Sequence, residues 1–203
     1  MSLTFRTASP ADVDAVLPLI YSSGPAAFDY IFSTGKKKPA DFLRRAIPTG
    51  KGEFGYHTHT VVIQRGVVVG AGATFTGGGL GEMMTLAGQI AGTYKGSAPS
   101  VIARGLKFER IVTPPKKGEH CIAHLGVDPE VQSNGIGTEL IERLLDDGRR
   151  LGRQRAVLDV SVENPRAQEL YERLGFLVTE QTESSLSNEY ATVPAHRRME
   201  LEL

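Results

Sequence analysis

The sequence has one cysteine, no tryptophan and no long apolar run. The single cysteine, Cys121, excludes an internal disulfide framework, and its place in an apolar stretch predicts a buried structural thiol. No stretch reaches the roughly 18 apolar residues that a membrane-spanning helix needs, and the N-terminus lacks the apolar segment of a secretory signal. We therefore expect a cytoplasmic protein that has no membrane partner.

Net charge is also absent. Lys and Arg together number 23, as do Asp and Glu, so the formal net charge is zero. A neutral chain gives no electrostatic reason to expect nucleic acid or an anionic membrane as a partner. Its 203 residues fit one domain, or one domain with an insertion.

The most informative stretch is a strand that leads into a glycine loop and then a helix. The apolar run Cys121–Val127 predicts a buried strand, and Asp128-Pro129 ends it. The loop Gln132–Gly137 follows, and a helical pattern begins directly after it. Such a loop points backbone N–H groups and the positive end of a helix dipole at one spot, which suits an anion such as a pyrophosphate. An ordinary strand-to-helix turn fits this motif equally well. Leu140 stands where a dinucleotide fingerprint needs its third glycine.

Hydrophobic periodicity predicts the elements on either side. The helix after the loop has a buried face made of Ile136, Leu140, Ile141, Leu144, Leu145 and Leu151. A buried strand is predicted over 156–162. Asn164-Pro165 then begins another helix, with the asparagine as its cap.

In the N-terminal half, Leu3–Thr7 alternates as a strand, and Ser9 and Asp12 have the spacing of a capping box. Two β-branched runs around Arg65-Gly66 predict a hairpin. His57 and His59 have the His-x-His spacing of metal ligands, but the sequence offers no third ligand, so we expect structural or solvent-facing histidines.

Taken together, Gln132-x-x-Gly135-x-Gly137, the strand at 156–162, Asn164, and Tyr171 ahead of Leu174-Gly175-Phe176 resemble the acetyl-CoA site of the GCN5-related N-acetyltransferase (GNAT) superfamily. The resemblance implies an α/β (α+β) fold, with a mixed, twisted sheet of six to seven strands and helices on both faces. It also implies acetyl transfer from acetyl-CoA to a primary amine without a metal. Residues 77–119 do not match the family's usual pattern, which predicts a helical insertion there.

The resemblance assigns the donor site. Ser133–Thr138 would bind the pyrophosphate through backbone N–H groups, Leu125–Val127 would pair with the pantetheine arm, and the Val127 N–H would polarise the thioester carbonyl. Asn164 would contact the pantetheine arm as well as cap its helix. The full set of expected donor-binding residues is Leu125, Gly126, Val127, Gln132, Ser133, Asn134, Gly135, Ile136, Gly137, Thr138, Asn164 and Tyr171.

The same resemblance makes Tyr171 the general acid that protonates the departing thiolate. The group that takes the amine proton is left open. Asp159 matches the position of a catalytic glutamate in some ribosomal-protein N-terminal acetyltransferases, although its side chain is shorter. His124 is an alternative because histidine has the best unperturbed pKa for a base. Glu119, His120 and a chain of water molecules are further alternatives.

Three questions stay open at this point. The chain could be an acyl-CoA-binding sensor without turnover, or an acyltransferase that uses a longer acyl-CoA. The acceptor could be a protein N-terminus, a lysine side chain or a small amine. The insertion could cover the acceptor pocket, or it could be a surface or homodimer contact.

Overall fold

The computed structural model describes residues 3–77, 79–131 and 135–203. Within these ranges a single sheet has seven strands in the order β1-β2-β3-β4-β5-β7-β6. Its neighbours are antiparallel except for β4 and β5, which are parallel. The strands are β1 (Leu3–Thr7), β2 (His59–Gln64), β3 (Val67–Phe75), β4 (His120–Val127), β5 (Arg155–Ser161), β6 (Leu177–Thr182) and β7 (His196–Glu202).

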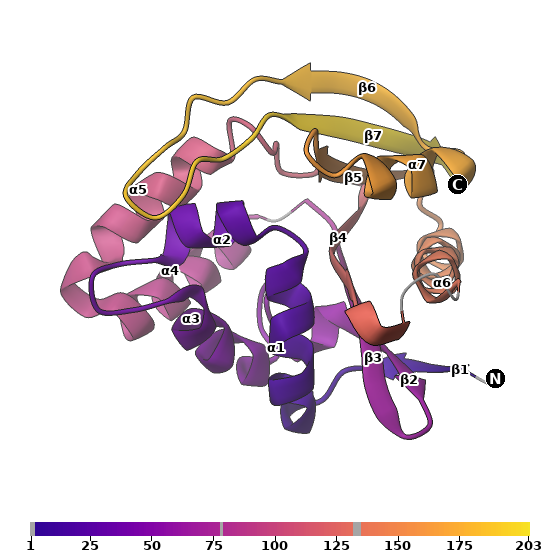
Figure 1. The fold of residues 1–203 in the computed structure, drawn as a ribbon, viewed down its shortest axis with the longest axis horizontal. Coiled ribbons are helices and arrows are strands. Elements are labelled where there is room, and N and C mark those ends of the chain that lie inside the picture. The colour runs from indigo at the N-terminus through magenta and orange to yellow at the C-terminus, as the bar shows by residue number, and fades with distance from the viewer. Residues whose placement is uncertain (1–2, 78, 132–134) are drawn as a thin grey trace.

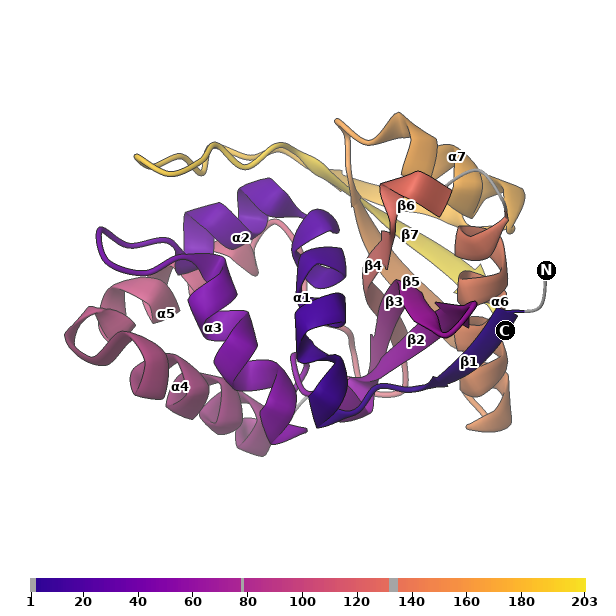
Figure 2. The ribbon, with the colours of Figure 1, turned by 60° about the horizontal axis from the view of Figure 1, so that its bottom comes forward.

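Helices cover both faces of this sheet (Figures 1 and 2). On one side lie α6 (Ile136–Arg150) and α7 (Pro165–Arg173). The other side carries α1 (Val13–Ser22), α2 (Pro25–Phe32), α3 (Pro39–Ala46), α4 (Leu80–Tyr94) and α5 (Ala98–Phe108). Short 3-10 turns occupy Pro10–Asp12, Ile47–Thr49, Tyr56–Thr58, Lys95–Ser97 and Pro129–Val131. The mixed seven-stranded sheet with helices on both faces confirms the predicted fold class.

Each face of the sheet has its own apolar core. One core joins α6 and α7 to alternate residues of β4 and β5, including Ile122 and Leu158. The second core holds the N-terminal helices and an aromatic group that includes Phe28, Phe42 and Phe54. Two cores on one sheet explain why the central strands are buried on both sides.

Several local predictions are confirmed. Asp12 accepts hydrogen bonds from the Ser9 backbone N–H and hydroxyl at 2.8 and 2.7 Å, which forms the acidic half of the capping box. Arg65 and Gly66 have φ values of 52° and 80°, the left-handed pair of a tight hairpin turn. Cys121 is buried, and burial raises the pKa of its thiol.

One prediction about α6 is wrong. Leu151 does not belong to the buried face of the helix, since 64% of it is exposed. The helix ends at Arg150, and Gly152 follows with a left-handed φ of 68°. Leu151 is therefore the residue at which the helical periodicity stops applying.

The segment 77–119 carries α4 and α5, which pack against each other and against α2 and α3 (Figure 2). The exposed face of α4 presents Leu80, Met83 and Met84. No helix in the described part of the chain is both long and apolar enough to cross a membrane.

Candidate active site

The central feature of the site is the separation of β4 from β5. Their parallel pairing comprises His120 with Ala156 and Cys121 with Val157. Beyond those pairs β4 continues to Val127, where it stays paired to β3, and β5 continues to Ser161, where it stays paired to β7. The two strands therefore diverge at the point where the sequence predicted a bound pantetheine arm.

The N-terminus of α6 lies beside the end of β4. Gly135 is the N-cap of α6 and has a left-handed φ of 79°, a conformation that favours glycine. A Cβ placed on Gly137 would lie 3.5 Å from Leu170 of α7 and 3.9 Å from Val127 of β4. Ile136 is buried in the core, and Thr138 is partly buried. Gln132, Ser133 and Asn134 lie outside the described residues.

Leu125 and Gly126 contact elements on opposite faces of the sheet. A Cβ on Gly126 would come within 2.2 Å of the Leu19 carbonyl oxygen in α1, so the missing side chain lets α1 approach β4. Leu125 packs into the core on the α6 side, where its side chain occupies the space that a Cβ on Gly72 of β3 would need. The strand segment predicted to bind acetyl-CoA thus also holds two neighbouring elements.

α7 supplies the other predicted donor-site residues. Asn164 caps α7, since its side-chain oxygen accepts the Ala167 N–H at 3.1 Å. Tyr171 is buried on the inner face, with its ring edge-on to Phe176. Burial raises the pKa of the Tyr171 phenol to about 12, so the hydroxyl keeps its proton at neutral pH.

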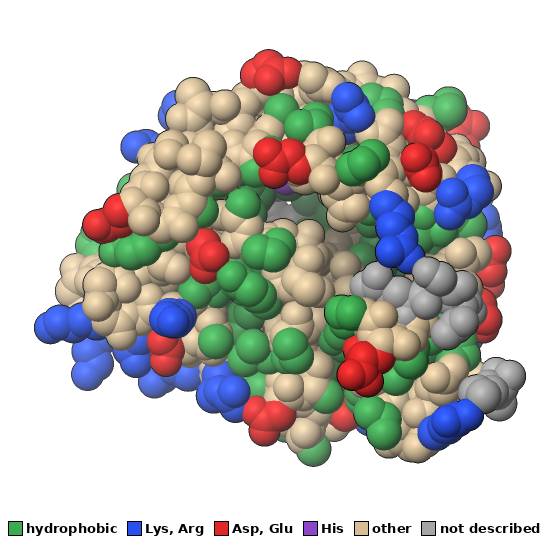
Figure 3. Space-filling model, viewed as in Figure 1, with side chains coloured by type: hydrophobic (Ala, Val, Ile, Leu, Met, Phe, Trp, Pro, Cys, Tyr) green, Lys and Arg blue, Asp and Glu red, His purple; other side chains and the backbone are tan. Residues whose placement is uncertain are grey.

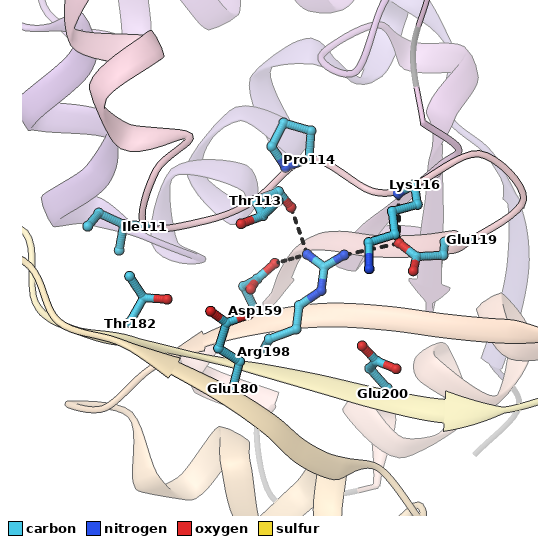
Figure 4. A pocket seen from close by; sticks show the side chains of 10 residues that line it. All are labelled: Ile111, Thr113, Pro114, Lys116, Glu119, Asp159, Glu180, Thr182, Arg198 and Glu200. Carbon is cyan, nitrogen blue, oxygen red and sulfur yellow. Dashed lines mark hydrogen bonds and ion pairs between the residues drawn. The ribbon is translucent and has the colours of Figure 1, made fainter.

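Asp159 lies on the opposite face of the sheet from α6. Its neighbours Leu158 and Val160 point into the α6-side core, so the alternating residue Asp159 points toward the face covered by the N-terminal helices. Figure 4 shows its carboxylate beside Arg198 of β7, at 2.8 Å. The same guanidinium pairs with Glu119 at 3.3 Å and donates to the Thr113 carbonyl at 2.7 Å.

Two effects act in opposite directions on the pKa of Asp159. Burial raises the pKa of Asp159 to about 6, and Arg198 acts in the opposite direction. Glu119 also accepts a hydrogen bond from the Lys116 backbone N–H at 2.7 Å, so this second carboxylate contacts both Arg198 and the backbone. Both acids therefore share the guanidinium group of Arg198, whose side chain is 12% exposed.

His124 lies in an aromatic stack on the same face as Asp159. Its ring is parallel to that of His59, with centroids 5.4 Å apart, and stacks on Phe54 at 5.0 Å. Nδ1 of His124 is 3.3 Å from Nε2 of His59, whose Nδ1 is 2.9 Å from the Gly55 carbonyl oxygen. Burial lowers the pKa of His124 to about 3 and that of His59 to about 4. His120 is on the α6 side of the sheet, with Nε2 2.8 Å from the Leu144 carbonyl.

Sequence reasoning missed two groups at this site. Arg198 carried no local signal, because its partner Asp159 is in another strand. Glu53 precedes β2 in an irregular loop; burial raises its pKa to about 7, with Glu109 and Glu82 adding to the shift. A carboxyl group that titrates near neutrality is a candidate for proton transfer, and only the fold shows that Glu53 is partly buried.

Figure 3 shows a hollow between the N-terminal helices α1 and α2 and the C-terminal strands, with acidic side chains on its rim. Asp159, Glu119 and Arg198 line a separate small pocket together with Thr113 and Glu180 (Figure 4). Among the described residues, no group of three or more His, Cys, Asp or Glu side chains is arranged to hold a metal ion.

Comparisons with known proteins agree with this geometry. The model of the Acetyltransferase (GNAT) family matches residues 52–176, more than half of the chain. A mycothiol acetyltransferase from Beutenbergia cavernae is 50% identical over 52 residues, which cover 26% of this chain and 18% of that protein. Curated relatives match over short stretches, and these cover between 18% and 37% of the relatives' own lengths.

Solved structures extend the likeness to the whole chain. An N-acetyltransferase from Staphylococcus aureus superposes with a TM-score of 0.63 at 18% identity, over 98% of this chain and 100% of its own. A candidate acetyltransferase from Salmonella typhimurium, solved with its cofactor acetyl-CoA, gives a TM-score of 0.59 at 19% identity, over 100% and 95%. At such low identity these structures establish a shared fold, which confirms the predicted acetyltransferase architecture.

Proposed function

The chain belongs to the Acetyltransferase (GNAT) family, and we propose on that basis that it transfers an acetyl group from acetyl-CoA to a primary amine. The observation that supports this most directly is the divergence of β4 and β5 beyond Cys121 and Val157. Beyond those pairs the two central strands are no longer paired with each other, and we propose that the space between them is the slot for acetyl-CoA. The slot ends beside the N-terminus of α6, where an anion is favoured.

In this proposal the donor lies along β4. The pantetheine arm follows Leu125–Val127, and the pyrophosphate sits at the start of α6, near Gly135 and Gly137. A Cβ on Gly137 would lie at van der Waals distance from Val127, 3.9 Å, which supports this arrangement because the end of the strand and the first turn of the helix are neighbours. The acceptor amine enters from the other side, through the hollow in Figure 3.

The reaction is a direct attack in a ternary complex. The amine nitrogen forms a bond to the thioester carbonyl carbon, and the carbon–sulfur bond breaks. One amine proton goes to a carboxylate on the acceptor side, and the Tyr171 phenol gives its proton to the departing thiolate. The burial that raises the pKa of the Tyr171 phenol would also raise the pKa of a CoA thiol that leaves beside it, so the two pKa values stay close to each other.

We assign the proton-acceptor role to Asp159 because it is on the acceptor face and its pKa of about 6 is near neutrality. Glu53 is the second candidate, with a pKa of about 7. Measuring pH–rate profiles of Asp159→Asn and Glu53→Gln separates them, since loss of the acid-limb pKa identifies the base. A profile unchanged in both variants would favour a chain of water molecules.

Donor binding is tested by calorimetric titration with acetyl-CoA, and with CoA as a second ligand. We expect micromolar binding by the native protein and none by Gly137→Glu, whose carboxylate would occupy the anion position. Gly88→Glu is the matched control, since Gly88 is exposed within α4 and a Cβ there meets nothing within 4 Å. Native protein that does not bind acetyl-CoA at millimolar concentration would overturn the proposal.

The acid role is tested by Tyr171→Phe, which removes only the hydroxyl group. We expect kcat to fall by about 100-fold, the lower end of what a positioned acid contributes, while the KM for acetyl-CoA stays within about twofold. Tyr94→Phe is the matched control, because Tyr94 is also buried but donates its hydroxyl to the Phe32 carbonyl at 2.7 Å. Unchanged kcat in Tyr171→Phe would contradict the role.

The alternatives correspond to other results of these assays. An acyl-CoA sensor would bind acetyl-CoA without acetylating any member of an amine panel. An acyltransferase with a longer donor would show a higher kcat/KM with a longer acyl-CoA. If the segment 77–119 covers the acceptor, deleting residues 80–112 in a variant that still folds will change the acceptor KM and spare acetyl-CoA affinity.

A further inference from the structure

β4 contains an irregularity immediately before the segment that we propose to bind acetyl-CoA. Ala123 pairs with Ala73, and Gly126 pairs with Ala71, so two residues of β4 oppose the single residue Gly72 of β3. This is a β-bulge, which bends its strand and redirects the side chains that follow. The bulge residues are His124 and Leu125.

His124 adopts a backbone conformation that few residues with a side chain adopt. Its φ is +53°, in the left-handed region that glycine occupies readily, that asparagine, aspartate and histidine enter more often than other residues, and that most side chains avoid. Contacts of the His124 side chain can therefore stabilise a conformation that the local backbone does not favour. On β3 the bulge is accommodated by Gly72, where a Cβ would lie 2.7 Å from the Leu125 side chain.

The contacts of His59 supply that restraint. The Gly55 carbonyl can only accept a hydrogen bond, so Nδ1 of His59 carries the proton at 2.9 Å. A neutral His59 then has a bare Nε2, which accepts from Nδ1 of His124 at 3.3 Å. Low pKa values of about 4 and 3 keep both rings neutral at physiological pH, as this chain of bonds requires.

We propose that His59 is a positioning residue that holds the His124 bulge and thereby sets the path of Leu125–Val127 along the acetyl-CoA slot. This inference rests on the proposed function. His124 serves here through its backbone conformation and its bond to His59, and it is not the proton acceptor. Burial and the neighbouring ring of His59 oppose the charge that a proton acceptor must take up, and both lower the pKa of His124.

A substitution series at His124 tests this directly. A backbone role predicts that His124→Gly and His124→Asn keep kcat within about threefold of the native value, because both residues tolerate a left-handed φ. His124→Val should lose at least about tenfold, because a β-branched residue is a strong outlier there. If His124 took the amine proton, all three variants would lose about 100-fold or more, and the proposal would be overturned.

The restraint itself is tested by combining substitutions. His59→Leu should lower kcat about tenfold while changing the acetyl-CoA Kd by less than about threefold. Placing His124→Gly in the His59→Leu background should restore most of that loss, since glycine needs no restraint. If the double variant is as slow as His59→Leu alone, His59 does not act through the bulge.

A readout without turnover separates failure of this inference from failure of the proposed function. The native protein, His59→Leu, His124→Gly and the double variant are also compared by thermal unfolding. If the bulge is held by His59, His59→Leu lowers the Tm less in the His124→Gly background than in the native one. Additive shifts in Tm would overturn the restraint even if no amine substrate is found, whereas coupled shifts without any acetylation would leave the restraint standing and count against the proposed function.

Discussion

Replacing Gly126 with alanine tests how tightly the donor segment is joined to the N-terminal helices. The added Cβ would lie 2.2 Å from the Leu19 carbonyl oxygen, 2.8 Å from its carbon and 3.0 Å from its Cα. All three atoms are backbone, so no side chain can rotate away. α1 and β4 would have to separate by about 0.8 Å before the oxygen contact reached the 3.0 Å limit that Cβ atoms respect.

Overpacking of a closed interior costs about 1–3 kcal/mol, and we expect the upper end here because both sides of the contact are main chain. For a domain of this size, about 3 kcal/mol corresponds to a fall in Tm of roughly 6–12 °C. Thermal unfolding followed by circular dichroism measures this shift. Urea unfolding should give a lower midpoint with an unchanged slope.

Gly137 provides the matched comparison, since it belongs to the same predicted donor site. A Cβ there meets nothing closer than 3.5 Å, so the added methyl group introduces no clash, and alanine is a better helix former than glycine. Gly137→Ala should therefore melt at or slightly above the native temperature. If Gly126→Ala melts within about 2 °C of the native protein, the close approach of α1 to β4 is not as the structure has it.

Three further predictions concern stability and reactivity. Asp12→Ala should lower the free energy of unfolding by about 1–2 kcal/mol at neutral pH. Because Arg6 lowers the pKa of Asp12, the stability that Asp12 contributes is present above about pH 4 and is lost as the pH falls. The unfolding curves of the native protein and the variant should therefore converge in acid. Arg198→Gln should raise the pKa of Asp159 above about 6, because it removes the cation that pairs with this carboxylate. The variant should be less stable by about 3–5 kcal/mol at pH 8, and by less at pH 5, where Asp159 can take up a proton. An equal loss of stability at both pH values would contradict this. Cys121 should resist a thiol reagent in the native state and react once urea unfolds the chain, and rapid native labelling would refute its burial.

The C-terminal half of the fold could be predicted from the sequence because its signals are local. Asn164 before Pro165 marked the start of α7 and caps it through a bond to a residue three positions away. The apolar periodicity located α6, and failed only at Leu151, where the helix ends. Such interactions depend on residues within one or two turns of each other, so a single chain reveals them.

The proposed acceptor side could not be predicted in the same way, because its contacts join distant segments. The ion pair of Asp159 with Arg198 links two strands, and the bond of His124 to His59 joins β4 to β2. The His-x-His spacing at His57 and His59 was visible, but nothing in it indicates that His59 faces another histidine. The sequence indicates only part of the role of Gly126 for the same reason: it predicts donor binding, which stays a prediction, and the structure adds the contact with α1.

Three successive residues of β4 have separate structural tasks. His124 is bonded to β2, Leu125 packs into the α6-side core, and Gly126 lies against α1. A segment held from three directions has little freedom to adjust when a ligand arrives. If it carries the groups that polarise the thioester, they are oriented in advance, which is how fixed dipoles stabilise a transition state most effectively. Loosening any one of the three contacts should therefore lower kcat before it weakens acetyl-CoA binding, because the arm can follow a displaced strand but the reacting carbonyl cannot.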